Sequence, residues 1–280
     1  MSELKQIIKS IISYYRILTW KKRALPDFII VGAQKAGTTS LFHYLSEHPQ
    51  IISPYKKEVH YFDGGLNPEI DTFKKGEKWY RSNFPRKPKS KSIKTFEASP
   101  LYLFNPLAPQ RIKDLLPNVK LIILLRDPVE RAISQYHHEN KKTKWDNMPI
   151  LEAMKMEEER MKKALDSKNY KSKEFIKYSY KARGRYKEQI ERYFTLFPKE
   201  NILIINSEEF FQKPEDILKA VLTFIEVDDE YVFKNLMPKN TGDYKQSKIN
   251  NDVKIYLKDY YQEHNKELYE FLGKNFNWYR

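Results

Sequence analysis

A chain of 280 residues with 40% hydrophobic and 14% aromatic residues can build a buried core, which excludes an intrinsically disordered protein. The absence of cysteine excludes disulfide bridges, thiolate metal sites and a cysteine nucleophile. A formal net charge of +14, from 51 basic and 37 acidic residues, indicates either an anionic partner or a surface that simply carries many lysines.

The first 25 residues are predicted to form an amphipathic helix. The helix combines apolar residues at helical spacing with basic residues around them: Leu4, Ile7, Ile8, Ile11, Ile12, Tyr15 and Leu18, with Lys5, Lys9, Arg16 and Lys21 to Arg23. The segment lacks the uninterrupted apolar centre of a signal peptide, and no stretch of the chain approaches the roughly 20 apolar residues of a membrane span. Such a helix either packs on its own domain or lies on an anionic membrane. We therefore expect a cytoplasmic protein, membrane-associated under the second alternative.

Three apolar runs predict buried strands of a parallel sheet: Phe28–Val31, Val119–Leu125 and Asn201–Ile205. Helical patterns lie between and after them, at Thr39–Ser46, from Val129 onward, at Arg185–Phe197, from Pro214 and at Asn251–Phe271. This alternation predicts an α/β fold in which helices flank both faces of a parallel sheet. We expect residues 26–280 to form one domain. A charged helical insertion at about 141–182 serves either as a lid or as a solvated helical face, and Pro85–Lys94 is a basic loop.

A glycine-bracketed loop follows the first strand. Gly32 and Gly37 are five residues apart, as in the ATP-binding pattern G-x-x-x-x-G-K-[ST], but the lysine is Lys35, inside the loop, and Thr38 follows Gly37. Backbone N–H groups of such a loop, at the start of the next helix, can hold a phosphate. A kinase would also need a strand ending in an aspartate for magnesium. The nearest candidate, Asp127, is followed by proline and fits poorly, so a kinase is the weaker interpretation.

A second polar element follows another strand. Arg126 comes directly after the run Val119–Leu125, and Ser134 lies two helical turns further along. Because ligands of open parallel sheets bind beyond the carboxyl ends of strands, we expect Arg126 to lie near the glycine loop. An arginine fork and a hydroxyl suit a second phosphate group.

Together these motifs resemble a known family. GAQKAGTTSL and LLRDPVERAISQY are similar to the two-part donor-binding signature of sulfotransferases that use 3′-phosphoadenosine 5′-phosphosulfate (PAPS). KKEVHYFD, Lys56 to Asp63, resembles a stretch of the N- and 3-O-sulfotransferases of heparan sulfate and of their bacterial relatives. Further motifs follow in the family order: Lys78–Tyr80, Phe96–Tyr102, Arg183–Tyr186 and Phe276–Trp278. The resemblance runs from about residue 26 to 280, and it implies a P-loop-type sulfotransferase fold with PAPS as co-substrate and no metal.

The resemblance also implies the donor site. In the family the first motif holds the 5′-phosphosulfate and the second the 3′-phosphate. The implied donor-binding residues are Lys35, Ala36, Gly37, Thr38, Thr39, Ser40, Arg126, Ser134, Arg183, Tyr186, Lys245 and Lys248.

Sulfuryl transfer is chemically close to phosphoryl transfer, an in-line displacement in which charge builds on the leaving oxygen. Lys35 is expected to meet that oxygen, and Glu58 to be the general base that takes the acceptor's proton. His60 lies on the same face if the stretch is extended, and is the second candidate for the base. Asp63 either hydrogen-bonds the acceptor or positions a basic group. The alternative for Glu58 is a surface carboxylate paired with Lys56 or Lys57, and for His60 a structural role.

Two departures from the vertebrate enzymes concern the acceptor. Ala98 stands where those enzymes have a lysine, and the late loop Lys239–Asn250 is short and has no cysteine. The expected acceptor is therefore a hydroxyl or an amine, on a saccharide, a glycan or another small molecule. The alternatives are a kinase and a non-catalytic basic protein that binds a nucleotide, RNA or a membrane. No nucleic-acid partner is expected, because the basic residues are spread along the chain and no recognised nucleic-acid motif occurs.

Overall fold

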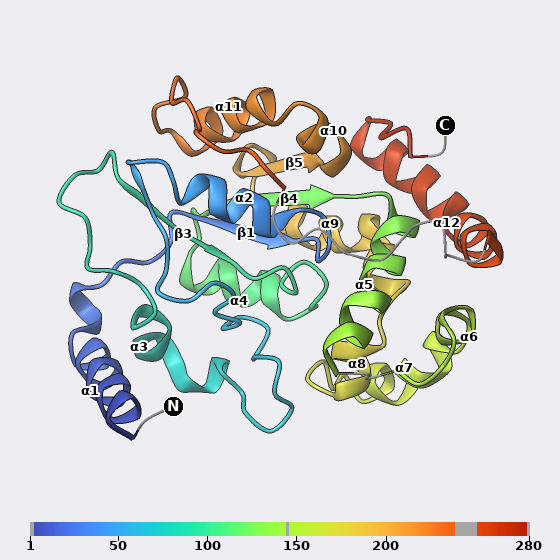
Figure 1. Ribbon diagram of the computed structural model, residues 1–280, viewed down its shortest axis with the longest axis horizontal. Helices are drawn as coiled ribbons and strands as arrows, with labels where there is room; N and C mark the ends of the chain where they lie inside the picture. Colours follow the sequence, from blue (N-terminus) through green and yellow to red (C-terminus); the bar gives the residue numbers. More distant parts are fainter. Residues whose placement is uncertain (1–2, 144–145, 239–250, 279–280) are drawn as a thin grey trace.

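In the computed structural model, which describes residues 3–143, 146–238 and 251–278, a parallel β-sheet forms the centre of the molecule (Figure 1). Its strands lie in the order β2-β3-β1-β4-β5 and all pair in parallel. They are β1 (Phe28–Gly32), β2 (Ile51–Ile52), β3 (Lys94–Ala98), β4 (Lys120–Leu125) and β5 (Ile202–Asn206). Their carboxyl ends therefore meet at one edge of the sheet, which is where ligands bind in such folds.

The three strands expected from apolar runs are confirmed within one residue at each end, as β1, β4 and β5. All residues of β1 and all but the first of β4 are buried, as the continuous apolar pattern requires, whereas Leu203 and Ile204 of β5 are half-buried. The sequence did not indicate β2, which has only two residues, or β3, which contains the polar residues Thr95 and Glu97.

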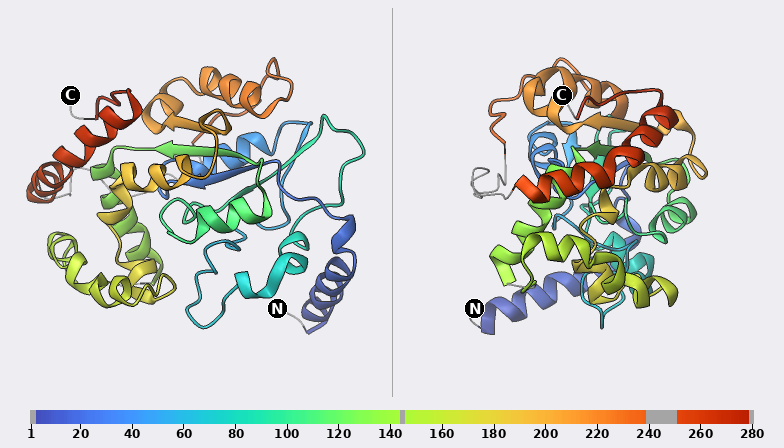
Figure 2. Two further views of the ribbon diagram at one scale, coloured as in Figure 1. Left: turned by 180° about the vertical axis from the view of Figure 1, so that it is seen from behind. Right: turned by 90° about the vertical axis from the view of Figure 1, so that its right-hand side faces the viewer.

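Helices cover both faces of the sheet, as predicted. Helices α2 and α11 lie on one face, and α4 and α9 on the other (Figures 1 and 2). The helices of this part are α2 (Thr38–Leu45), α3 (Gly76–Arg81), α4 (Ala108–Leu115), α5 (Pro128–Thr143), α9 (Tyr186–Phe194), α10 (Ser207–Gln212), α11 (Pro214–Ile225) and α12 (Asn251–Leu272). Short 3-10 turns occur at η1 (Trp20–Lys22), η2 (Phe73–Lys75) and η4 (Lys199–Asn201).

The charged segment after α5 is helical and forms no strand over its described residues, 146–182. It contains α6 (Ile150–Lys155), α7 (Glu157–Asp166) and α8 (Lys173–Lys177), and leads into η3 (Ala182–Gly184). Met154 and Tyr180 join it to α5 and α12 in one apolar cluster, so this segment is packed and is more than a solvated face. The division of the chain at residues 25 and 26 and the limits of the insertion remain predictions.

Helix α1 (Glu3–Leu18) forms as expected and lies at the opposite end of the molecule from α12 (Figures 1 and 2). It does not bury its apolar residues against the domain: Leu4 and Ile11 remain more than half exposed. The alternative in which this face packs on its own domain is therefore wrong. None of the helices formed by the described residues is long and apolar enough to cross a bilayer.

Candidate active site

The glycine loop occupies the carboxyl end of β1 and leads directly into α2. Gly37 is the N-cap of α2 and has a left-handed backbone, with φ of 95°, which glycine adopts at no steric cost. Gly32 cannot carry a side chain, because a Cβ there would lie 2.5 Å from Cβ of Leu103. No side chain caps the first turn of α2, so its backbone N–H groups can receive an anion. The buried hydroxyls of Thr38 and Ser40 lie in the same turn.

The second motif meets this loop, as the strand-end argument predicted. Arg126, at the end of β4, donates from Nη1 to the carbonyl oxygen of Lys35 at 3.0 Å. The Tyr186 hydroxyl in turn donates to the carbonyl oxygen of Arg126 at 2.8 Å. Ser134 is buried on α5. Lys35 itself is half-buried and has a positive φ of 71°. Two candidate phosphate-binding elements thus lie side by side.

Arg183 joins the same site from η3. Its side chain is buried and donates from Nη1 to the side-chain oxygen of Gln34, within the loop. It also donates to Ser179 Oγ at 2.8 Å and to the carbonyl oxygen of Ile176 at 2.6 Å. Burial lowers the pKa of Arg183 to about 10, assisted by the charge of Arg131, so the guanidinium stays charged at neutral pH. Gln34 was not among the predicted site residues.

Two predicted donor-site residues lie outside the described residues: Lys245 and Lys248. Their contribution to a phosphate site stays a prediction from the sequence.

Glu58, His60 and Asp63 form a connected group. His60 Nδ1 lies 2.6 Å from Asp63 Oδ2, and His60 Nε2 lies 3.4 Å from Glu58 Oε2 without the alignment of a hydrogen bond. Lys57 Nζ contacts Glu58 Oε1 at 2.5 Å. The Asp63 carboxylate is fully buried and also accepts from Gly65 N at 2.9 Å, so it faces His60 and not solvent. Of the two roles predicted for Asp63, this geometry favours positioning.

The charges of this group favour Glu58 over His60 as a base. Burial alone would raise the pKa of Glu58, but the His60 ring and the Lys57 ammonium hold it at about 2. Burial would lower the pKa of His60, but Asp63 and then Glu58 raise it to about 9. At neutral pH Glu58 is therefore ionised and can accept a proton, whereas His60 is already protonated and can only donate.

The stretch from Glu58 to His60 is not extended, so the condition under which the sequence placed His60 on the same face as Glu58 is not met. Glu58 and His60 both have left-handed backbones, with φ of 60° and 54°. Such a backbone is strained for residues with a side chain and persists only where the surroundings hold it. Here Glu58 N donates to the carbonyl oxygen of Ala98 at 3.1 Å, and His60 N donates to Ser99 Oγ at 3.1 Å. Both side chains nevertheless reach one pocket.

A buried carboxylate supports this stretch from beneath. Glu97 is fully buried in β3 and accepts from three hydroxyls, those of Tyr80, Ser99 and Tyr102. The Tyr102 oxygen in turn accepts from Tyr61 N at 2.8 Å and from Phe62 N at 3.3 Å. Glu97 thus orients two hydroxyls that hold the backbone of residues 60–62. These residues belong to motifs noted in the sequence, but the sequence did not indicate the hydrogen bonds that connect them.

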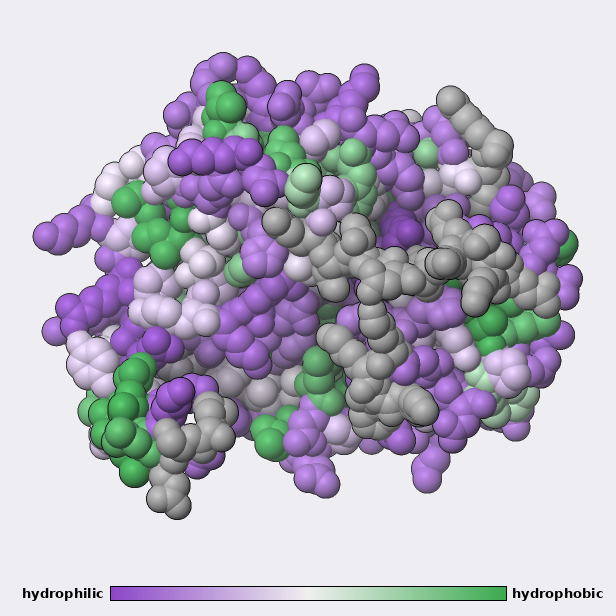
Figure 3. All heavy atoms as spheres, viewed as in Figure 1, coloured by the Kyte–Doolittle hydropathy of each residue, from purple (hydrophilic) through white to green (hydrophobic). Residues whose placement is uncertain are grey.

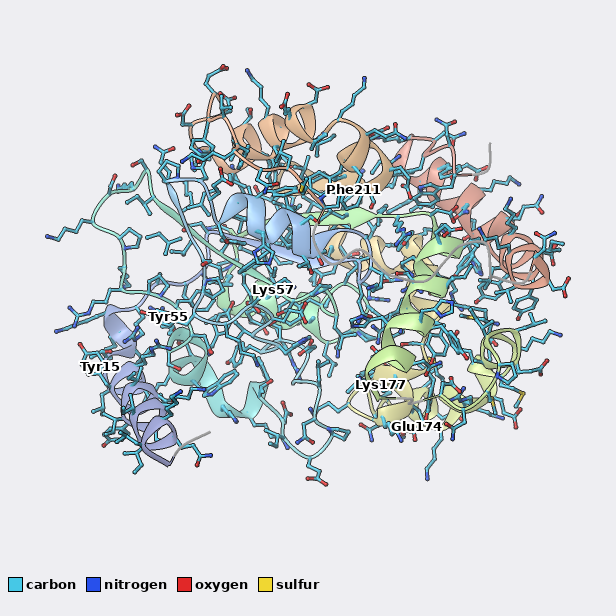
Figure 4. All side chains as sticks on the ribbon, viewed as in Figure 1. Tyr15, Tyr55, Lys57, Glu174, Lys177 and Phe211 are labelled. Carbon is cyan, nitrogen blue, oxygen red and sulfur yellow. The ribbon has the colours of Figure 1, made fainter. Side chains whose placement is uncertain are left out.

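The pocket is lined by residues of the glycine loop, of the stretch that carries Glu58 and His60, and of the charged helical segment. Its lining residues are Gln34, Glu58, His60, Leu66, Pro100, Leu101, Glu139, Ile176, Lys177 and Arg183. Lys177 comes from α8 and contacts Glu139 of α5 at 2.9 Å. Lys57, which contacts Glu58, lies near the centre of the molecule beside α2 (Figure 4). The segment at 146–182 therefore contributes one wall of the pocket.

A lysine holds the loop that contributes Leu66 to the pocket. Lys171 Nζ donates to four backbone carbonyl oxygens of the loop that carries Leu66: Gly64 at 2.6 Å, Asn67 at 2.8 Å, Ile70 at 2.9 Å and Gly65 at 3.3 Å. Burial lowers the pKa of Lys171. Nothing in the local sequence indicated this contact, which joins residues about 100 positions apart.

Asp127, the nearest candidate for a magnesium ligand, has a different role. Its Oδ1 accepts from Val129 N at 2.8 Å at the start of α5, and its own backbone N donates to Glu208. Burial raises the pKa of Asp127 to about 6. The residue caps a helix, which does not favour a kinase.

Comparison with known proteins agrees with this geometry. Residues 25–279 match the family described as "Sulfotransferase domain". The chain belongs to the sulfotransferase family. It is therefore an enzyme, in a family whose general property is the use of PAPS.

Relatives of this sulfotransferase include a solved structure and several curated proteins. The crystal structure of a sulfotransferase from Alicyclobacillus acidocaldarius superposes with a TM-score of 0.71 and is 30% identical, covering 92% of this chain and all of the other. The membrane-associated sulfotransferase kil1 of Dictyostelium discoideum is 27% identical over 92% of this chain and 67% of its own length. Heparan sulfate glucosamine 3-O-sulfotransferase 3B1 of Mus musculus is 28% identical over 91% of this chain and 65% of its own. The chain spans only 30% of the bifunctional heparan sulfate N-deacetylase/N-sulfotransferase 1 of Caenorhabditis elegans, to which it is 28% identical.

Proposed function

We propose that this sulfotransferase transfers a sulfuryl group from PAPS to a hydroxyl or amine of a saccharide or glycan, with Glu58 as the general base. The observation that carries the proposal is the shared pocket. Glu58 and His60 line it together with Gln34 of the glycine loop and with Arg183. A carboxylate that is ionised at neutral pH thus lies next to a loop suited to phosphate.

The residues present suit an anionic donor. The uncapped first turn of α2 and the hydroxyls of Thr38 and Ser40 offer donors for the 5′-phosphate. Arg126 and Ser134 offer a guanidinium and a hydroxyl for the 3′-phosphate. Contacts of Arg126 with Lys35 and of Arg183 with Gln34 hold these elements in one arrangement before the donor binds.

In the reaction PAPS supplies the sulfuryl group. As the acceptor oxygen or nitrogen forms its bond to sulfur, the bond between sulfur and the bridging phosphate oxygen breaks. Glu58 takes the acceptor's proton, and Lys35 neutralises the charge that remains on the leaving phosphate. Protonated His60, held by Asp63, donates towards the acceptor or the sulfuryl oxygens.

The acceptor class rests on the pocket and on the relatives. The walls combine the apolar side chains of Leu66 and Ile176 with the Lys177–Glu139 ion pair, a mixture that suits a polyhydroxylated ring. Two of the relatives are named for the sulfation of heparan sulfate, one on nitrogen and one on the 3-oxygen. An acidic or amino-containing glycan is therefore the first acceptor to test.

The test combines donor binding with transfer. Calorimetry should detect binding of the product nucleotide, 3′-phosphoadenosine 5′-phosphate, in the presence of EDTA. Labelled PAPS is then offered with heparosan, N-deacetylated heparosan and a simple phenol as acceptors. Failure to bind the nucleotide would overturn the donor assignment, and a magnesium-dependent turnover of ATP would favour a kinase instead.

The base is tested by a matched pair of variants. Glu58→Gln should leave nucleotide affinity within about twofold and lower kcat by about 10²–10⁴-fold, the usual contribution of a general base. Glu215→Gln removes an exposed carboxylate of α11 that lines neither pocket and should leave kcat unchanged. If Glu58→Gln transfers sulfate at the wild-type rate, the base assignment is wrong.

A further inference from the structure

Helix α1 carries an exposed apolar stripe. The stripe consists of residues that recur on one face of the helix: Leu4, Ile7, Ile8, Ile11, Ile12, Tyr15 and Leu18. Each is between 42% and 66% exposed, although the same residue types elsewhere in the chain fill the core. Contiguous apolar patches on a soluble protein mark a site of interaction.

The helix is anchored to the domain at its carboxyl end. Buried Arg23 donates to the carbonyl oxygen of Arg16 at 2.9 Å, to Thr19 Oγ1 at 3.0 Å and to the carbonyl oxygen of Phe84 at 2.9 Å. The Arg16 guanidinium stacks on the ring of Tyr55, 3.5 Å from its centre. The rings of Tyr15 and Tyr55, both at this end of the molecule (Figure 4), lie 6.0 Å and 5.8 Å from the Arg23 guanidinium. These contacts, together with the hydrogen bond from the Arg86 guanidinium to the Tyr15 hydroxyl, hold the last turns of α1, while the other residues of the stripe remain exposed.

A basic loop lies next to this anchor. Ala24 N donates to the carbonyl oxygen of Pro85, and Lys87 N to that of Lys22, each at 2.9 Å. The exposed basic side chains of this region, which we call the basic belt, are Lys5, Lys9, Lys21, Lys22, Arg86, Lys87, Lys89 and Lys91. Glu3 is the one acidic residue in the sequence of residues 3–23, and residues 85–94 contain none. Figure 3 shows an apolar patch at the position of α1 with hydrophilic side chains beside it.

We propose that α1 docks this protein on an anionic lipid bilayer, with the apolar stripe inserted at the interface and the basic belt on the lipid headgroups. An apolar face flanked by Lys and Arg is the pattern of helices that lie in the plane of a membrane surface. Anionic headgroups satisfy both features at once. A second copy of the chain would place two basic belts against each other, and RNA would leave the apolar stripe exposed.

The proposal goes beyond sulfuryl transfer and is tested without it. The full chain is sedimented with vesicles of phosphatidylcholine alone and of phosphatidylcholine mixed with phosphatidylserine. The protein should pellet with the mixed vesicles only, and less as salt is raised, because each basic side chain near the surface contributes about fivefold to affinity. In sedimentation velocity without vesicles, the mass of the protein should not increase with concentration as a result of contacts between α1 helices.

Matched variants locate the contact. Ile11→Asp in the stripe should weaken vesicle binding at least about tenfold, because an inserted side chain of this size is lost. Ile255→Asp, at an equally exposed apolar position on α12, should not. Lys21→Gln with Lys22→Gln should weaken binding more than tenfold, whereas Lys162→Gln with Lys163→Gln on α7 should have little effect.

Three results would overturn the proposal. One is the absence of binding to the mixed vesicles, and another is binding that Ile11→Asp leaves unchanged. The third is a dimer in solution that Ile11→Asp dissociates, which would assign the stripe to self-association. Nucleotide binding and soluble-acceptor transfer should be unchanged in Ile11→Asp, so a misfolded variant is recognised separately.

Discussion

Two buried tyrosines offer a sharp test of how the catalytic stretch is held. Tyr80 and Tyr102 are both fully buried, and each donates its hydroxyl to Glu97. Only the Tyr102 oxygen also accepts from the backbone, from Tyr61 N and Phe62 N. Tyr80→Phe and Tyr102→Phe therefore each remove one hydroxyl that donates to Glu97. Only Tyr102→Phe also releases the stretch that carries Glu58 and His60.

The magnitudes follow from these contacts. A hydrogen bond to a charged group contributes about 1.5–3 kcal/mol, so Tyr80→Phe should lower the free energy of unfolding by about that amount. Tyr102→Phe loses a similar bond and leaves two buried N–H groups without an acceptor, each at about 1–3 kcal/mol. We expect a total loss of about 3.5–9 kcal/mol for Tyr102→Phe, and a domain of ordinary stability, about 5–15 kcal/mol, tolerates the lower part of this range.

Urea unfolding measures these losses, and transfer at saturating PAPS and acceptor measures kcat. Tyr102→Phe should lower kcat at least about tenfold, because a small displacement of a catalytic group has an effect of this size, and Tyr80→Phe should lower it less than about twofold. Nucleotide affinity should be the same in both variants, since neither tyrosine contacts the glycine loop. Equal losses of kcat would refute the reasoning. Ser99→Ala, which removes the acceptor of His60 N, gives a second test with less loss of stability.

Other predictions follow from the site. The pKa of His60 is near 9 in the folded protein, above its unfolded value. Its contribution to stability is therefore full below about pH 6.5 and is lost as pH rises through 9. The unfolding free energy should fall over that range in the wild type but not in His60→Gln. Lys171→Met should speed hydrogen exchange in residues 64–71 and raise the acceptor KM several-fold with nucleotide affinity unchanged, and unaltered exchange would contradict it. Gly37→Ala should weaken nucleotide binding at least about tenfold by calorimetry, because φ of 95° costs about 1–2 kcal/mol with a side chain and the new Cβ would lie 2.9 Å from Phe211 (Figure 4).

Sequence patterns predicted the strands that are apolar throughout and missed the strand that is not. In β1 and in β4 from Leu121 to Leu125 both faces are buried, so the residues of the pattern are apolar. In β3, Thr95 and Glu97 are buried and polar, and their partners come from elsewhere in the chain: Leu25 and Asp27 for Thr95, tyrosine hydroxyls for Glu97. A local pattern cannot reveal a partner that lies far away in the sequence.

The site was predictable to a similar extent. The neighbourhood of Arg126 and Lys35 follows from the strand-end rule for parallel sheets, and it is confirmed. The left-handed backbone of Glu58 and His60 could not be predicted, because the local sequence does not favour it and the contacts that hold it come from Ala98 and Ser99. The catalytic roles of these residues remain proposals.

Arg183 gives the two substrates a common residue. Its guanidinium holds Gln34 on the donor side and the carbonyl oxygen of Ile176, a wall of the acceptor pocket, on the other. Under the proposed function, Arg183 would therefore connect the donor side of the site to the acceptor side. Thermodynamic linkage then requires reciprocity: the factor by which bound nucleotide changes acceptor affinity is the factor by which bound acceptor changes nucleotide affinity.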